Sequence, residues 1–143
     1  MELKFQENYD TLKQLCPPKN YQAKQMTEVF RWVFEDINDE RNFESQYHKN
    51  PKRFQLKSDK EKCQALALSM FDNKNGAKER FSELFDDMGS KIYQTIGNRI
   101  AKGIINEEDG VNGNIERLGH FNHHPALKTD YSKIFQILEE EKL

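Results

Sequence analysis

Three of the chain's four histidines lie in one short segment, GHFNHHP, at residues 119–125. Imidazoles this close together suit metal binding, proton transfer or a structural place beside a turn. On a helix, His120, His123 and His124 would share a face and could chelate zinc. The flanking glycine and proline disfavour a helix, so we expect an extended segment. Alternate side chains then point to opposite sides, and zinc would need a further protein ligand.

The remaining candidates for that ligand are Cys16, Cys63 and His48, but no spacing in the sequence requires any of them. We therefore predict no metal site, and a structural or surface role for most of these rings. His120 is the exception, because it follows a glycine and precedes a Phe that we expect in the core. An imidazole near its unperturbed pKa suits hydrogen bonding or proton transfer. The alternative is a half-buried histidine bonded to the backbone.

Arg31 lies inside the apolar run VFRWVF, residues 29–34. A guanidinium in such a run either faces solvent or needs a carboxylate, phosphate or carbonyl partner, because unpaired burial is costly. A solvent-facing strand residue is the simpler interpretation. On a central strand, Arg31 would instead suit the anion of a nucleotide or of an acidic peptide. Lys52 and Arg53, in the following polar segment, could then join it.

Ser69 lies in the apolar segment ALSMF, just before a helical pattern. The GxSxG motif of a hydrolase is missing, so we expect a buried serine bonded to a neighbouring strand. No P-loop, dinucleotide glycine fingerprint, Cys/His dyad or calcium loop is visible. From the residues alone, Arg31 and Arg53 are the candidates for binding an anionic cofactor, and His120 is the candidate for proton transfer.

Hydrophobic spacing predicts the elements that position these residues. Residues 3–16 carry a helical stripe that the prolines at 17 and 18 end. Residues 26–37 suit a strand buried on both faces, although a helix also fits. Residues 38–59 form a long polar loop, pinned by Phe43, Tyr47 and Phe54.

The second half of the chain contains the clearest helix, over residues 73–88, with Asp72 as its N-cap and Gly89 as its end. We expect strands at residues 63–71, 99–105 and 130–138, a turn at 109–113, and an extended segment through the histidines. Strands and helices do not alternate strictly, so we predict an α+β fold with a largely antiparallel sheet, two main helices and an N-terminal amphipathic helix.

The length of 143 residues fits a single domain. Within residues 1–143 we expect a helical arm at 1–18, an α+β core at 26–138 and an acidic tail at 139–143. Lys and Arg number 22 against 24 Asp and Glu, a balance that does not support a nucleic-acid binder.

The sequence also bears on the compartment. No apolar run reaches the roughly 18 residues that span a bilayer, and the polar, acidic N-terminal segment does not resemble a signal peptide. Two cysteines without CxxC spacing indicate reduced thiols in a cytoplasmic protein.

Five motifs in order, VFRWVF, NFESQ, ALSMFDNKNGAKERF, IGNRIAKGII and GHFNHHP, resemble those of a group of small uncharacterised bacterial proteins over residues 26–138. The opening part is also similar to RES-type and other ADP-ribosyltransferase-like domains. In those domains an early-strand Arg and a later Ser line an NAD cleft, which implies this role for Arg31 and Ser69. The departure is the catalytic Glu: Glu116 is the nearest candidate, and His120 would otherwise stand in its place.

Two functions follow from these patterns. The first is an accessory module without a cofactor, which binds another protein in a bacterial defence or toxin system. It rests on the incomplete catalytic set and on an N-terminal stripe suited to docking. The alternative is an ADP-ribosyltransferase-like enzyme that uses NAD, with Arg31 at the pyrophosphate or ribose and Ser69 and His120 nearby. The sequence does not fix the oligomeric state.

Overall fold

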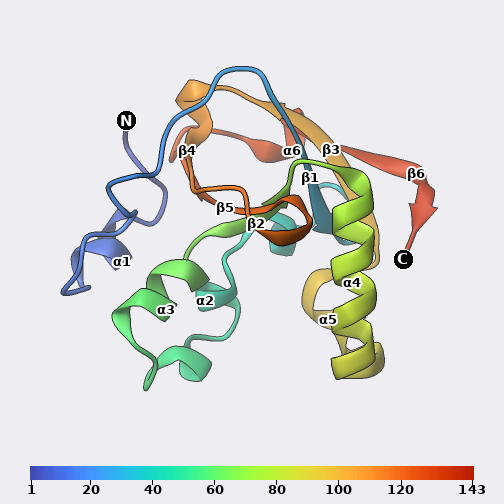
Figure 1. Ribbon diagram of the computed structural model, residues 1–143, viewed down its shortest axis with the longest axis horizontal. Helices are drawn as coiled ribbons and strands as arrows, with labels where there is room; N and C mark the ends of the chain where they lie inside the picture. The colour runs from blue at the N-terminus through green and yellow to red at the C-terminus, as the bar shows by residue number, and fades with distance from the viewer.

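The computed structural model describes residues 1–143 and contains one six-stranded sheet with the strand order β4-β5-β2-β1-β3-β6. Every pair of neighbouring strands is antiparallel, which confirms the predicted α+β class and sheet type (Figure 1). The strands are β1 (Thr27–Val33), β2 (Leu68–Phe71), β3 (Arg99–Ile105), β4 (Gly110–Asn112), β5 (His120–Pro125) and β6 (Gln136–Lys142).

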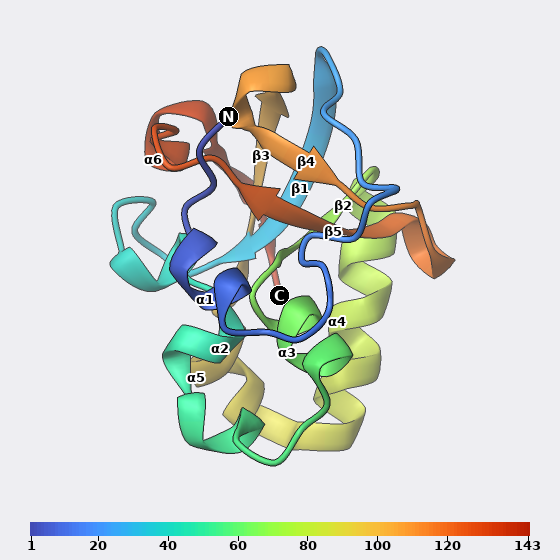
Figure 2. The same cartoon turned by 90° about the vertical axis from the view of Figure 1, so that its left-hand side faces the viewer.

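The helices lie beside this sheet and at one end of it. They are α1 (Gln6–Asp10), α2 (Gln46–Lys49), α3 (Asp59–Ala65), α4 (Lys74–Met88), α5 (Ile92–Ile96) and α6 (Tyr131–Ile134). The two views show α1, α2 and α3 gathered at one end, with α4 standing apart from them (Figure 1, Figure 2). α4, with 15 residues, is the only long helix. The prediction of a second main helix is therefore wrong.

Apolar side chains fill both faces of the sheet. One cluster comprises Val29, Val33, Leu68, Met70, Ala101, Ile105, Phe121, Tyr131 and Phe135. The other lies under α4 and comprises Phe30, Phe71, Ala77 and Ile100. Neighbouring residues of β1 therefore enter different clusters, as they must in a strand covered on both faces. This confirms a strand rather than a helix for the run that contains Arg31.

α4 follows the predicted hydrophobic stripe and ends at the predicted glycine. Its N-cap is Asn73 rather than Asp72, because the Asn73 side chain accepts a hydrogen bond from the backbone N–H of Gly76, at 2.6 Å. Gly89 ends the helix with a φ of +65°, a conformation in which only glycine is unstrained.

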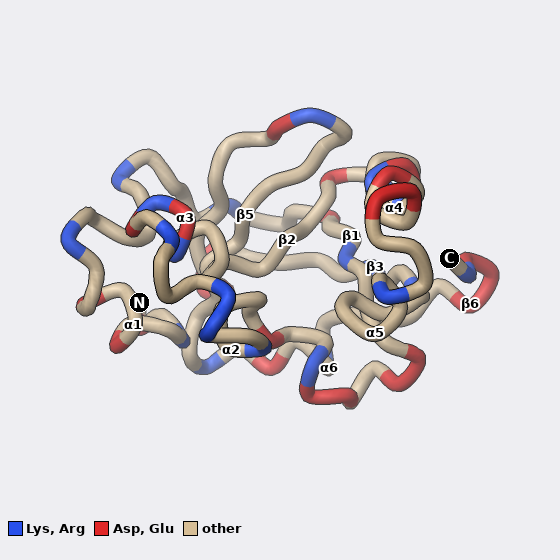
Figure 3. Tube along the Cα trace, turned by 90° about the horizontal axis from the view of Figure 1, so that it is seen from below, with Lys and Arg blue, Asp and Glu red and all other residues tan.

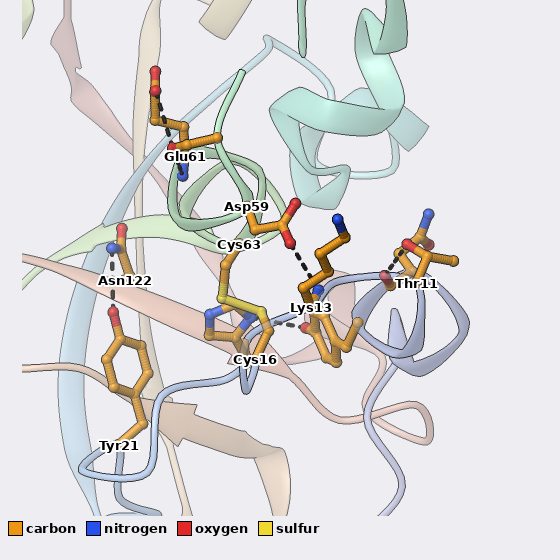
Figure 4. The surroundings of a disulfide bond; sticks show 12 residues. Thr11, Lys13, Cys16, Tyr21, Asp59, Glu61, Cys63 and Asn122 are labelled. Atoms are coloured by element: carbon orange, nitrogen blue, oxygen red, sulfur yellow. Dashed lines mark hydrogen bonds between the residues drawn. A yellow bond between two sulfur atoms is a disulfide. The ribbon is translucent and has the colours of Figure 1, made fainter. Parts of the chain in front are cut away.

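The N-terminal arm differs most from the prediction. Its helix spans only Gln6–Asp10, and the rest of the arm is held by a disulfide between Cys16 and Cys63 of α3. Next to the disulfide, the backbone N–H of Lys13 donates to the Asp59 carboxylate at 2.7 Å (Figure 4). The predicted reduced thiols are therefore wrong. The two cysteines are 47 residues apart, so the local sequence around either one does not indicate that they are bonded.

Two other segments change their element type. Ser58 caps α3, so the helix takes up residues 59–65 and only Leu68–Phe71 of the predicted strand 63–71 is extended. Near the C-terminus, Asp130 caps the short α6, and the strand β6 starts only afterwards. β6 includes most of the predicted tail, because the tail pairs with β3, where Lys142 lies opposite Arg99. Lys74 and Lys78 of α4 also each pair with Glu141 at 2.9 Å.

The long polar segment 38–59 folds against the body through its aromatic residues, as predicted. Phe43 stacks on Tyr131 with ring centroids 5.5 Å apart, and Phe54 is buried.

Acidic and basic residues are interspersed over the surface segments, and α4 carries residues of both signs (Figure 3). None of the helices has the length and apolar content that a membrane crossing requires.

Candidate functional site

Ser69, His120 and Glu116 form a chain of side-chain hydrogen bonds across two neighbouring strands. The Ser69 hydroxyl lies 3.1 Å from Nε2 of His120, and Nδ1 of the same ring lies 3.3 Å from a carboxylate oxygen of Glu116. Ser69 belongs to β2 and His120 opens β5, where Phe71 is paired with His120. Ser69 and His120 therefore lie on one face of the sheet.

A tight turn brings Glu116 to His120. The backbone N–H of Glu116 donates to the carbonyl of His120 at 2.7 Å, and that of Gly119 donates to the carbonyl of Glu116 at 3.0 Å. Leu118 and Gly119 both have positive φ, +62° and +80°. A Cβ at position 119 would come within 2.0 Å of the Asp72 carboxylate. Only glycine fits there, so the turn that sets this geometry depends on Gly119.

The protonation of this chain follows from its partners. The Glu116 carboxylate accepts a hydrogen bond, which places the proton of neutral His120 on Nδ1 and leaves Nε2 to accept from the Ser69 hydroxyl. Burial lowers the pKa of His120 below its ordinary value, while the Glu116 hydrogen bond opposes that shift. At neutral pH the ring is thus a neutral base that is oriented by a carboxylate and bonded to a hydroxyl, an arrangement suited to proton transfer.

Arg31 is buried and does not face solvent. Its Nε donates to the carbonyl of Asn42 at 2.8 Å, and its Nη1 to the carbonyl of Ser69 at 2.6 Å. The contact with Ser69 is to its main chain, and the Arg31 side chain does not reach His120 through any hydrogen bond. β1 and β2 share a single paired position, Phe30 with Phe71, so the guanidinium lies where the two strands separate.

Arg31 and Ser69 line a small hollow of about 40 Å³. Its other walls come from Trp32, Phe34, Arg41, Asn42, Glu44, Gln46, Lys49, Ala67 and Ile96. A larger hollow of about 530 Å³ adjoins it and contains Arg53. Arg41, Glu44, Gln46 and Lys49 line both. The two sequence-based candidates for cofactor binding, Arg31 and Arg53, therefore lie at the inner and outer parts of one cleft.

Cations outnumber carboxylates in this cleft, since Arg31, Arg41, Lys49 and Arg53 line it together with Glu40 and Glu44. Burial lowers the pKa of Arg31 to about 10, so the guanidinium stays charged at neutral pH. Burial, and secondarily the charge of Arg31, lower the pKa of Lys49 to about 8. The sequence reasoning missed Lys49 and Arg41. Their only signal was their place in a long polar loop, where functional residues are frequent.

The other two histidines of the cluster, His123 and His124, are fully buried. His123 bonds through one nitrogen to Asn112 and through the other to the Tyr131 hydroxyl, and burial lowers its pKa to about 3. His124 bonds through Nδ1 to the Tyr9 hydroxyl at 2.8 Å. Only His120 of the three is therefore placed beside Ser69. The predicted extended segment is confirmed, and His120 and His123 have separate partners on it.

Comparison with protein-family models, with curated proteins and with solved structures gives no match to this chain. Its function has to be argued from the cleft and from the Ser69–His120–Glu116 chain.

Proposed function

We propose that the protein is an ADP-ribosyltransferase-like enzyme that binds NAD in the cleft between Arg31 and Arg53. The observation that carries the proposal is the 2.6 Å hydrogen bond from Arg31 to the Ser69 carbonyl, which holds both residues in the wall of one hollow. The resemblance to RES-type domains implies an Arg and a Ser that line an NAD cleft together. The outer hollow, about 530 Å³, has the volume of a small-molecule site.

The charges of the cleft suit a dinucleotide. The hydrogen bonds of Arg31 within the chain use Nε and Nη1, so Nη2 remains a donor for a phosphate oxygen. Lys49 and Arg53 supply two further cations along the same path. A pyrophosphate with its negative charges is favoured at such a site, because guanidinium and ammonium donors form charge-assisted hydrogen bonds with phosphate.

The Ser69–His120–Glu116 chain would supply the base. In ADP-ribosyl transfer the bond between ribose C1′ and the nicotinamide nitrogen breaks, and its electron pair leaves with nicotinamide. An acceptor oxygen bonds to C1′ and loses its proton. We assign that proton, passed through the Ser69 hydroxyl, to Nε2 of His120. Glu116 then stabilises the imidazolium, as a carboxylate does in a serine–histidine–acid triad.

The accessory-module hypothesis has less support from the geometry. Most of the N-terminal stripe that motivated it packs inside the molecule, where Phe5 and Tyr9 are buried in one cluster with the disulfide and only Leu15 is exposed. That hypothesis, and a protein partner in a defence or toxin system, stay predictions. The enzyme proposal includes a cytoplasmic location. Disulfides usually persist in oxidising compartments, so in the cytoplasm thiol reductants would act on the Cys16–Cys63 bond.

Calorimetric titration with NAD tests the proposal. Arg53 is exposed and lines the outer hollow, whereas its neighbour Lys52 is exposed and lines neither hollow. Arg53→Ala should weaken NAD binding by about tenfold, the value of one lost charged contact. Lys52→Ala, the matched control, should leave the affinity within twofold. Absence of NAD binding by the unmodified protein, or equal losses in the two variants, would overturn the proposal.

A further inference from the structure

Three chain segments meet at the Cys16–Cys63 disulfide. Cys16 follows α1, Cys63 lies in α3, and His124 lies in β5. All three residues are buried, with exposed fractions of 6%, 3% and 0%. A ring nitrogen of His124 and the two sulfur atoms lie within 4.8 Å of one another. The proposed NAD cleft uses none of these residues.

His124 carries an unsatisfied nitrogen at this position. Nδ1 is bonded to the Tyr9 hydroxyl, but Nε2 is sealed from solvent and has no hydrogen-bond partner. Buried polar atoms rarely stay unpaired, because the lost hydration costs on the order of 1–3 kcal/mol. If Nδ1–H donates to the Tyr9 oxygen, Nε2 holds a free lone pair on a ring that lies beside the two sulfurs.

This donor set matches what a thiophilic divalent cation requires. Zinc binds thiolate sulfur and imidazole nitrogen, and in a tetrahedral site such ligand atoms are roughly 3.5–3.8 Å apart. The bonded sulfurs are closer than that, and the imidazole can be as far as 4.8 Å away. Breaking the disulfide would let the sulfurs separate, and a small inward shift would complete three ligands. A histidine ligand is usually fixed by a hydrogen bond from its second ring nitrogen to a carboxylate, a backbone carbonyl or water, and here the Tyr9 hydroxyl takes that place.

We propose that Cys16, Cys63 and His124 form a zinc site when the disulfide is reduced. A dithiol reductant supplies two electrons and two protons, becomes a disulfide itself, and leaves two thiols in the protein. Zinc then displaces the two thiol protons and binds both sulfurs and Nε2 of His124, with water as the fourth ligand. The metal replaces the covalent link between the N-terminal arm and α3, so the arm stays attached under oxidising and reducing conditions.

Cobalt is the direct probe, because tetrahedral thiolate–cobalt complexes absorb in the near-ultraviolet and visible. The full-length protein, reduced with a dithiol and freed of reductant and metal under nitrogen, is titrated with Co²⁺. We expect thiolate–cobalt bands that saturate at one equivalent and are abolished by Zn²⁺. The oxidised protein is the matched control and should give no bands. Reduced protein without such bands would overturn the proposal.

The histidine ligand is tested separately. His124→Asn should weaken cobalt binding by at least tenfold, whereas His120→Asn, outside the cluster, should not change it. Equal affinities in both variants would contradict the assignment of His124. X-ray absorption of the zinc-loaded, reduced wild-type protein requires no variant and covers the case of a His124 variant that does not fold. It should show two sulfur ligands with nitrogen and oxygen, and a shell of oxygen and nitrogen alone would contradict the site.

Discussion

The Ser69 hydroxyl and the His120 imidazole, 51 residues apart in sequence, lie 3.1 Å from each other on neighbouring strands. The pairing of β2 with β5 produces this contact, because the antiparallel register sets Phe71 opposite His120 and leaves Ser69 one diagonal position away. Glu116 completes the chain from the turn that precedes β5. A hydroxyl, a base and an orienting acid are thereby joined, and of these three residues Ser69 also lines the inner hollow of the cleft.

Glu116→Gln should lower the turnover of NAD by about 10–100-fold without changing its affinity. The amide keeps the shape of the side chain but stabilises a protonated His120 much less than a carboxylate does. Nicotinamide release measured over a range of NAD concentrations separates the effect on kcat from that on KM. Glu108→Gln, an exposed acid outside the site, is the control, and an equal loss in the two variants would argue against a role for Glu116.

NAD affinity should depend on pH through Lys49. With a pKa of about 8, the ammonium is charged below that pH and loses its proton as the pH rises through it. The affinity should therefore be constant near pH 6–7 and fall above pH 8, by at most about tenfold per pH unit for one linked proton. Lys49→Arg keeps its charge at these pH values, so calorimetry on this variant should show no fall. A fall of the same size in Lys49→Arg would exclude Lys49 as its cause.

Loss of the Arg31 side chain should destabilise the fold. Arg31→Met keeps the bulk but leaves the carbonyls of Asn42 and Ser69 without their donor. Each unpaired buried carbonyl costs on the order of 1–3 kcal/mol, so urea unfolding should show a loss of about 2–6 kcal/mol. Arg53→Ala at the surface should change the unfolding free energy by less than about 0.5 kcal/mol. A loss below about 1 kcal/mol in Arg31→Met would mean that the guanidinium is not needed for folding.

Reduction of the disulfide in the presence of a metal chelator should also lower stability. The bond closes a loop of 47 residues, for which chain entropy gives about 4 kcal/mol. Urea unfolding of the oxidised and reduced wild-type protein measures the difference. Added zinc should return part of this loss in the reduced protein only, because a ligand that binds the folded state stabilises it. Equal stability of both forms with chelator would show that the arm is held without the disulfide.

The elements with a strong hydrophobic pattern were predictable from the sequence. β3 has the predicted bounds, and α4 follows its predicted stripe of five apolar positions. β1 could be read in two ways, and the burial of both its faces is what settles it as a strand. The short helices α3 and α6 were missed, because their apolar residues also fit the spacing of a strand. Each helix is marked in the sequence by one capping residue, Ser58 for α3 and Asp130 for α6.

The candidate site was only partly predictable. Ser69 and His120 stood out by residue type, but their contact depends on strand register, which single-sequence patterns do not encode. Arg31 was identified, yet its partners are main-chain carbonyls that leave no mark in the sequence. Lys49 was missed, because its burial beside Arg31 depends on segments that are distant in the sequence. His124 was named with Cys16 and Cys63, but no spacing in the sequence shows that the fold brings the three together.

Release of nicotinamide from NAD by the wild-type protein and by His120→Ala tests the central claim most directly. His120 is at the surface of the sheet and only partly buried, so the variant should fold, which circular dichroism verifies, and should bind NAD with unchanged affinity. The account predicts release by the wild-type protein and a 100- to 10,000-fold lower rate in the variant, the usual range of about 10²–10⁴ for loss of a general base. Equal rates for the two proteins, or no release by the wild-type protein, would contradict it.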